Sequence, residues 1–189
     1  MTRAQLLVRA AVSGGVLAAG PLAARAIADI KDDASLASYL LTMEYVQSGL
    51  YRDALKEVPN LSADAKRLAS VLRDQEVEHV DALRATIEEA GGSPPDRLPL
   101  DFGDALASES RFLKLANTLE DTAVSAYNGA APRLESREFL AVFASIAQVE
   151  ARHSALVRLL RGKPPAPLAF DKASNQQAVR TTLREFEVR

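Results

Sequence analysis

The chain has 189 residues, which is enough for one ordinary domain, and its 48% hydrophobic and 25% charged residues are typical of globular proteins. A formal net charge of −2, an aromatic content of 5% and the lack of Trp argue against a nucleic-acid-binding surface, which needs basic and stacking side chains. The absence of Cys excludes disulfide scaffolds, thiolate metal sites and Cys nucleophiles. Since the chain has only two His, any imidazole chemistry must use His79 or His153.

The first 28 residues have the pattern of a secretory signal peptide. They contain no acidic residue, and Arg3 and Arg9 precede an Ala-rich apolar run over residues 10–24, which small-x-small sites follow at 24–26 and 26–28. This pattern predicts an exported protein and leaves the export route open. The run is shorter than the roughly 18 residues that a spanning helix needs, so no membrane span is expected. The alternative is an Ala-rich first helix that packs on the domain.

Helical periodicity extends over residues 33–161, with apolar residues recurring every three or four positions. It predicts four helices near residues 33–57, 62–90, 104–131 and 135–161, separated by Pro- and Gly-containing breaks. Residues 162–189 are predicted to form a Pro-rich tail with a short helix near 176–186.

The lengths of the connections predict the topology. Few residues separate the first helix from the second and the third from the fourth, so each pair is expected to be an antiparallel hairpin. The linker over residues 91–103 contains three Pro and covers ~40 Å when extended at ~3.1 Å per residue. The second helix spans ~43 Å at ~1.5 Å per residue, so the linker can run along the bundle. The sequence therefore predicts an all-α four-helix bundle of two antiparallel hairpins joined by one long crossover.

Acidic and imidazole groups interrupt the apolar stripes that should face the core. The first and third helices each carry a lone Glu, and the second and fourth each place a Glu three residues before a His: Glu44, Glu76, His79, Glu120, Glu150 and His153. Residues three apart lie about 5–6 Å apart on one helix face, so each Glu/His pair can ligate one centre. In a chain of this composition with two His, both would have a Glu three residues earlier by chance in only about 0.5% of sequences. Tyr51 and Tyr127 each follow a lone Glu by seven residues.

Four carboxylates in a helical core cost several kcal/mol each to desolvate and repel one another. The stripes carry no Lys or Arg to offset this, whereas two divalent cations supply four compensating charges. The alternative is a buried network of neutral carboxylic acids with raised pKa values. Tyr51 and Tyr127 are then either packed core residues with satisfied hydroxyls or a second layer around the metal ligands.

This constellation resembles the ferritin-like superfamily of di-metal carboxylate proteins over residues 33–161, and its ligand pattern is similar to bacterioferritin and rubrerythrin-type domains. The resemblance rests on Glu44 and on the segments DQEVEH, NTLEDT and QVEARH. It implies that Glu76 and Glu150 bridge two metals, one held by Glu44 with His79 and the other by Glu120 with His153. The exported N-terminus and the Pro-rich tail also resemble a bacterial secreted branch that includes desiccation-related proteins.

Departures from the family limit this expectation. The second helix has no Met to ligate a haem, the chain has no Cys for a rubredoxin-like module, and the tail gives no sign of the helix that closes ferritin cages. The resemblance then implies two iron ions, with manganese as a second choice, and oxidation of Fe(II) or reaction with O2 or H2O2. Manganese-catalase-like disproportionation of H2O2 and a metal-stabilised structural or stress protein without turnover remain alternatives, so an enzymatic role stays open. The expected partners are metal ions and O2 or H2O2, with a homodimer as the default assembly.

Overall fold

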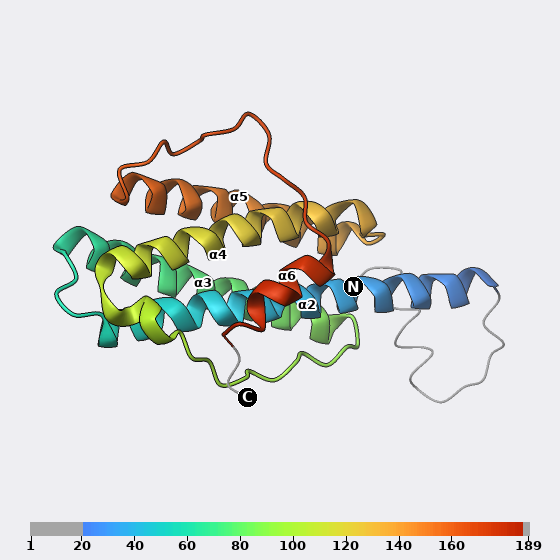
Figure 1. The fold of residues 1–189 in the computed structure, drawn as a ribbon. Coiled ribbons are helices and arrows are strands. Elements are labelled where there is room, and N and C mark those ends of the chain that lie inside the picture. Colours follow the sequence, from blue (N-terminus) through green and yellow to red (C-terminus); the bar gives the residue numbers. More distant parts are fainter. Residues whose placement is uncertain (1–20, 187–189) are drawn as a thin grey trace.

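The computed structural model describes residues 21–186 of the chain, with side chains from residue 32 onward. Four long helices form a bundle (Figure 1): α2 (Pro21–Glu57), α3 (Ala63–Glu89), α4 (Glu109–Ala130) and α5 (Arg137–Leu160). The described part also contains a short helix, α6 (Gln176–Leu183), and two 3-10 helices, η1 (Gly103–Ala107) and η2 (Ala131–Arg133). The predicted all-α fold class is confirmed.

The bundle consists of two helical hairpins. Helix α2 packs most extensively on α3, and α4 packs most extensively on α5. Ser62 caps α3 by accepting a hydrogen bond from the backbone N–H of Ala65 at 3.2 Å, and Ser136 caps α5 in the same way. A hydroxyl at this position satisfies a backbone donor that the first helical turn leaves unpaired, so a helix can begin directly after a short loop.

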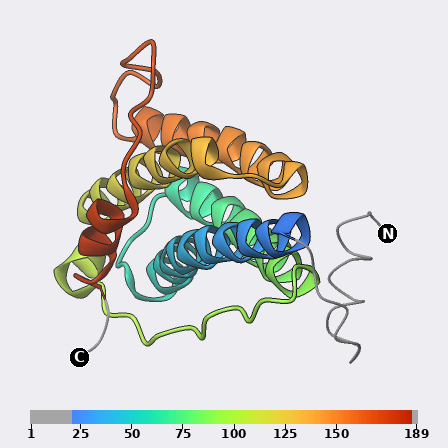
Figure 2. The same ribbon diagram turned by 90° about the vertical axis from the view of Figure 1, so that its right-hand side faces the viewer.

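The crossover from α3 to α4 runs along the outside of the bundle, so that these two helices point in the same direction (Figures 1 and 2). Tyr45 on α2 holds this segment by donating its hydroxyl hydrogen to the carbonyl of Pro95 at 3.2 Å. Leu100 lies directly over Gly49, where an added Cβ would come within 2.7 Å of the leucine Cδ1. The predicted long crossover is therefore present, and it covers one side of α2.

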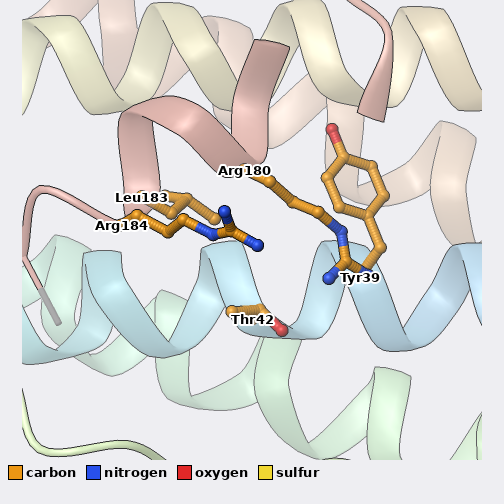
Figure 3. A pocket seen from close by; sticks show the side chains of 5 residues that line it. All are labelled: Tyr39, Thr42, Arg180, Leu183 and Arg184. Carbon is orange, nitrogen blue, oxygen red and sulfur yellow. The ribbon is translucent and has the colours of Figure 1, made fainter. Parts of the chain in front are cut away.

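The tail after α5 returns to the bundle before α6 and packs on it through α6. The backbone N–H of Ser174 donates to the carbonyl of Ser125 on α4 at 2.8 Å, and α6 then buries Val179 and Leu183 against the bundle. A cavity of about 40 Å³ remains between α6 and α2, lined by Tyr39, Thr42, Arg180, Leu183 and Arg184 (Figure 3). The part of the tail from Ser174 to the end of α6 is thus attached to the bundle.

Two helix boundaries differ from the sequence prediction. Helix α2 begins at Pro21 rather than near residue 33, because the Ala-rich sequence continues the helix toward the N-terminus and Pro suits a first helical position. The predicted third helix began near Asp104, but residues 103–107 form η1, and the extended backbone of Ser108 separates it from α4. Ser108 then caps α4 by accepting from the N–H of Arg111.

The predicted signal peptide over residues 1–28 lies largely outside the described residues, which begin at residue 21. Its last eight residues belong to the first turns of α2. Export therefore stays a prediction. None of the helices within residues 21–186 is both long enough and apolar enough to cross a membrane.

Candidate metal centre

All six residues singled out by the sequence meet in the middle of the bundle. Each helix of the bundle contributes: Glu44 comes from α2, Glu76 and His79 from α3, Glu120 from α4, and Glu150 and His153 from α5. The four glutamates are completely buried, and the exposed fractions of His79 and His153 are 7% and 1%. Because the Glu and the His of each pair are three residues apart, they lie on the same face of their helix and both point inward.

The six side chains form two overlapping groups of possible metal ligands. One group contains Glu44, Glu76, His79 and Glu150, and the other contains Glu76, Glu120, Glu150 and His153. Within each group, one ligand atom per residue lies within 4.8 Å of all the others. Glu76 and Glu150 belong to both groups, so the arrangement is that of two neighbouring positions sharing two carboxylates.

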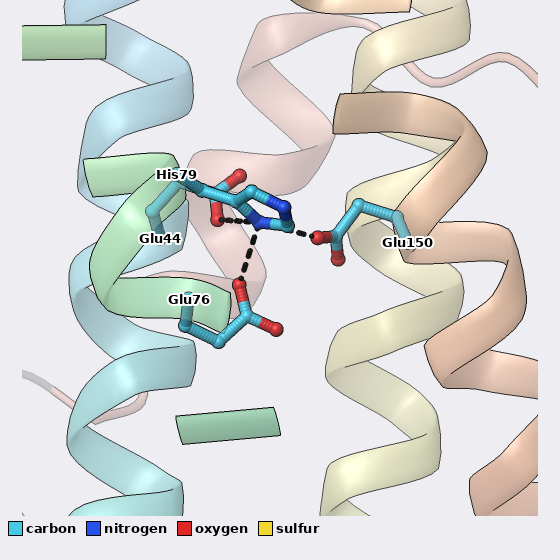
Figure 4. Close-up of side chains that lie close together, drawn as sticks. All are labelled: Glu44, Glu76, His79 and Glu150. Atoms are coloured by element: carbon cyan, nitrogen blue, oxygen red, sulfur yellow. Dashed lines mark hydrogen bonds and ion pairs between the residues drawn. The ribbon is translucent and has the colours of Figure 1, made fainter. Parts of the chain in front are cut away.

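The first position surrounds Nδ1 of His79 (Figure 4). This nitrogen lies 3.3 Å from Oε2 of Glu44, 3.1 Å from Oε2 of Glu76 and 3.0 Å from Oε1 of Glu150. Three carboxylates from three helices thus converge on one imidazole nitrogen.

The second position surrounds Nδ1 of His153 in the same way. This nitrogen lies 3.0 Å from Oε1 of Glu76, 3.6 Å from Oε2 of Glu120 and 3.7 Å from Oε1 of Glu150. Glu76 therefore turns one oxygen toward each histidine, and Oε1 of Glu150 lies between the two. Both carboxylates therefore lie beside both histidines.

Burial and mutual repulsion raise the pKa values of Glu44, Glu76 and Glu150. Burial is the main cause that raises the pKa of Glu44 to about 7 and that of Glu150 to about 8, and the neighbouring carboxylates add to both. Burial also raises the pKa of Glu76, with repulsion from Glu150 and Glu120 as further causes. Without a cation, the cluster therefore retains protons that isolated carboxyl groups would have lost.

The pKa values of the two imidazoles are also raised, but by the neighbouring carboxylates and against the effect of burial. Burial by itself lowers the pKa of His79, but hydrogen bonds with Glu150, Glu44 and Glu76 outweigh it and raise that pKa to about 12. For His153, hydrogen bonds with Glu120 and Glu76 likewise outweigh burial and raise the pKa to about 10. In the metal-free protein, protonated histidines therefore supply part of the positive charge that the carboxylates need.

A second layer of hydrogen bonds surrounds the six residues. Tyr127 on α4 donates to Oε1 of Glu44 at 2.5 Å, and Tyr51 on α2 donates to Oε1 of Glu120. Burial is the main reason that the pKa values of both phenols are raised well above 10.0, so both remain donors. Both tyrosines therefore contact the candidate ligands in addition to packing in the core.

Two glutamines complete this layer. Gln47 is completely buried, and its amide donates to Oε2 of Glu120 at 3.0 Å and to Oε2 of Glu150 at 2.9 Å. Oε1 of Gln75 on α3 lies 2.7 Å from Nε2 of His153. Gln47 follows Glu44 by three residues and so lies on the same inward face of α2, whereas Gln75 reaches the site from an exposed position of α3 for which helical periodicity gives no signal.

The donor set fits metal ions. Oε1 of Glu150 is buried, and among the described residues it has no well-aligned hydrogen-bond donor besides its ion-pair contact with Nδ1 of His79 at 3.0 Å. The nearby basic residues do not reach the centre: Arg73 pairs with Asp74, Arg84 donates to Tyr45, and Lys114 and Arg152 are exposed. Two divalent cations would balance four carboxylates and satisfy this oxygen. The buried Glu and His groups can hold metal ions, while the assignment of each residue as a ligand stays a prediction.

Comparison with known proteins supports this interpretation of the fold. A model of the ferritin-like domain family matches residues 32–163, which include all four bundle helices from residue 32 onward and all six candidate ligands. No curated protein is similar enough in sequence to be counted as a relative. The matched segment covers more than half of the chain, and the protein belongs to the ferritin-like domain family.

Proposed function

We propose that this protein binds iron at the two positions of the centre and oxidises Fe(II) with O2 or H2O2. The observation that carries the proposal is the pair of ligand groups that share Glu76 and Glu150. Two Fe(II) ions release one electron each, and one H2O2 accepts two electrons and two protons to become two water molecules. A centre that holds two ions side by side can therefore serve one oxidant molecule with both electrons.

The residues of the chain would divide the work of binding. Glu76 and Glu150 reach both positions, while Glu44 with His79 and Glu120 with His153 each complete one of them. Nδ1 of both histidines faces the carboxylates, so each imidazole must release its Nδ1 proton before it can ligate. Tyr51 and Tyr127 donate their hydroxyl hydrogens to Glu120 and Glu44, the two carboxylates that each belong to one position only, and keep them oriented.

Ligand chemistry and burial support iron and small oxidants. Imidazole combined with carboxylate suits iron and manganese, and zinc can occupy such ligands without redox activity. The candidate ligands are at most 7% exposed, which favours O2 or H2O2 over a bulky organic substrate. Manganese-dependent disproportionation of H2O2 and a purely structural role of the metal use the same ligands, so the choice between them rests on assays.

The first experiment is to measure the metal content of the purified protein and its oxidation of Fe(II). We expect close to two iron or manganese ions per chain and consumption of O2 or H2O2 when Fe(II) is added to the metal-free protein. Glu76→Ala/Glu150→Ala should lose both properties. The matched control is Glu78→Ala/Glu89→Ala, which removes two exposed carboxylates from α3 and should behave as the wild type.

Three results would contradict the proposal in different ways. A folded wild type that takes up no iron or manganese would overturn metal binding itself. Two bound ions with no oxidation of Fe(II) would favour a structural role of the metal. Release of O2 from H2O2 by the manganese form alone would favour the catalase-like alternative.

A further inference from the structure

The two hairpins carry the same site residues in the same order, and this internal repeat makes the exceptions visible. Glu44 and Tyr51 on α2 correspond to Glu120 and Tyr127 on α4, with a constant offset of 76 residues. The Glu/His pairs of α3 and α5 are offset by 74 residues: Glu76 and His79 against Glu150 and His153. The two second-layer glutamines break the repeat, because both belong to the first hairpin.

Gln47 has an apolar counterpart. The equivalent position on α4 is Ala123, which is completely buried and offers no polar side-chain atom. Gln47 donates to Glu120, which belongs to the second position alone, and to Glu150, which belongs to both positions. Ala123 can give no such support to Glu44, the corresponding ligand of the first position.

Gln75 is the second exception. Its counterpart on α5 is Val149, which cannot accept a hydrogen bond with its side chain. Gln75 Oε1 accepts the Nε2–H of His153, which leaves Nδ1 of that ring to the carboxylates. Within the described residues, Nε2 of His79 has no corresponding hydrogen bond. The two glutamines therefore contact Glu120 and His153, the two residues that belong to the second position alone, and within the described residues neither forms a hydrogen bond with Glu44 or His79.

Hydrogen bonds of this kind fix the orientation of ligands before the ion arrives. A donor or acceptor on the far nitrogen of a ligating His sets its tautomer and ring angle, and removing such partners typically costs 10–100-fold in metal affinity. Gln47 also places a shared donor between Glu120 and Glu150, which reduces the repulsion of two carboxylates in the empty site. A carboxylate oxygen has room for both an amide hydrogen and a cation, so this donor does not block binding.

We propose that the two metal positions are unequal, and that Gln47 and Gln75 make the position of Glu120 and His153 the first to fill. This inference rests on the proposed metal binding at the same centre. Gln47 and Gln75 are positioning residues, since each acts on the ion through a ligand that it orients. Within the described residues, Glu44 and His79 themselves receive only the Tyr127 hydrogen bond from outside the six candidate ligands, so their position then takes the second ion more weakly.

The test is a titration of the metal-free protein with Co²⁺ alone under argon. Binding is monitored by calorimetry and by the visible spectrum of the bound ion. The wild type should bind two ions in two steps whose dissociation constants differ at least tenfold. Gln47→Leu/Gln75→Leu should weaken the first step by 10–100-fold and leave the second within about threefold. The control is Gln148→Leu on α5, an exposed glutamine whose replacement should change neither step.

Single-ligand variants identify which position fills first. Glu44→Gln removes a ligand from the position around His79 and should keep the tighter binding step. Glu120→Gln removes a ligand from the position around His153 and should lose that step. Persistence of the tight step in Glu120→Gln, or equal steps in the wild type, would overturn the inference and leave two-metal binding intact. A folded wild type that binds no Co²⁺ would instead overturn the proposed metal binding together with the inference.

Folding of each variant is checked by far-UV circular dichroism before the titration. Should Gln47→Leu fail to fold in the buried core, Gln75→Leu alone tests the inference from the exposed side of α3. Its tight step must then weaken by about tenfold or more, and an unchanged tight step in this variant contradicts the role of Gln75.

Discussion

Tyr127 on α4 donates its hydroxyl hydrogen to Oε1 of Glu44 on α2 at 2.5 Å, so a tyrosine of the second hairpin orients a candidate ligand of the first. Tyr51 does the reverse, since it donates from α2 to Glu120 on α4. The two hairpins thus exchange one hydrogen bond in each direction across the centre. Glu44 and Glu120 are therefore each held by a tyrosine of the other hairpin.

Tyr127→Phe should destabilise the metal-free protein because Oε1 of Glu44 loses its donor while remaining completely buried. We expect the free energy of unfolding to fall by about 1–3 kcal/mol, measured by urea denaturation at pH 8 with a chelator present.

The matched control for this variant is Tyr39→Phe. Tyr39 is 2% exposed, and its hydroxyl has no hydrogen-bond partner in the part of the chain that the structure describes, so its removal should leave the free energy of unfolding unchanged or raise it. Equal destabilisation by the two substitutions would show that the Tyr127 hydroxyl contributes only packing.

The stability of the metal-free protein should fall as the pH rises from about 5 to 8.5. The pKa values of Glu44 and Glu150 are raised from 4.5 to about 7 and 8, and those of His79 and His153 are raised from 6.5 to about 12 and 10. The folded protein therefore holds protons that the unfolded chain has already released. This contribution to stability is complete below the unfolded pKa values and is lost as the pH passes the folded ones.

Thermal unfolding of the metal-free protein at pH 5.5, 7 and 8.5 measures this dependence. The slope should become shallower in Glu150→Gln, because the neutral amide no longer titrates and no longer repels the neighbouring carboxylates. A melting temperature that rises with pH over this interval would contradict the pKa directions of the cluster.

Metal binding should reverse that loss of stability at pH 8. Free metal at 100 times its dissociation constant adds about 2.7 kcal/mol for one site, which corresponds to an increase in Tm of at least about 5 °C for a chain of this length. The measurement is a melting curve with Mn²⁺ and then with an excess of chelator, which should return Tm to its starting value.

Glu76→Ala/Glu150→Ala should show no increase in Tm with Mn²⁺, while Glu78→Ala/Glu89→Ala should show the full one. The same increase in both variants would place the stabilising ion on the surface of the protein and away from the centre.

Periodicity and residue type were sufficient to predict the bundle and the convergence of the six residues. A Glu or His inside an otherwise apolar stripe stands out in the sequence, and the faces of four amphipathic helices must meet in one core. Gln47 carried the same signal, since it lies on the stripe of Glu44 and Tyr51. Its two acceptors on α4 and α5 depend on how the hairpins dock, which local sequence does not specify.

The residues that the sequence could not identify act between elements. Gln75 lies on an exposed flank of α3, and only the packing of α3 beside α5 brings its amide to His153. Asp33 marked merely the expected beginning of the first helix, whereas the structure places it within α2 as an acceptor for the loop before α5. The beginning of α2 itself was missed because an Ala-rich segment satisfies both a leader peptide and a helix.

Asp33→Ala should lower the free energy of unfolding by about 1–2 kcal/mol, because the carboxylate is fully buried and accepts the backbone N–H groups of Glu135 at 3.2 Å and Ser136 at 2.8 Å. These bonds attach the turn between α4 and α5 to α2, so their loss loosens the contact between the two hairpins near the start of α5. The matched control is Asp32→Ala, which removes an exposed carboxylate one residue earlier and should change the free energy by less than about 0.5 kcal/mol. Urea denaturation measures both, and metal content should remain that of the wild type, since Asp33 is not among the candidate ligands. Equal effects of the two substitutions would mean that the buried acceptor adds nothing to the docking of the hairpins.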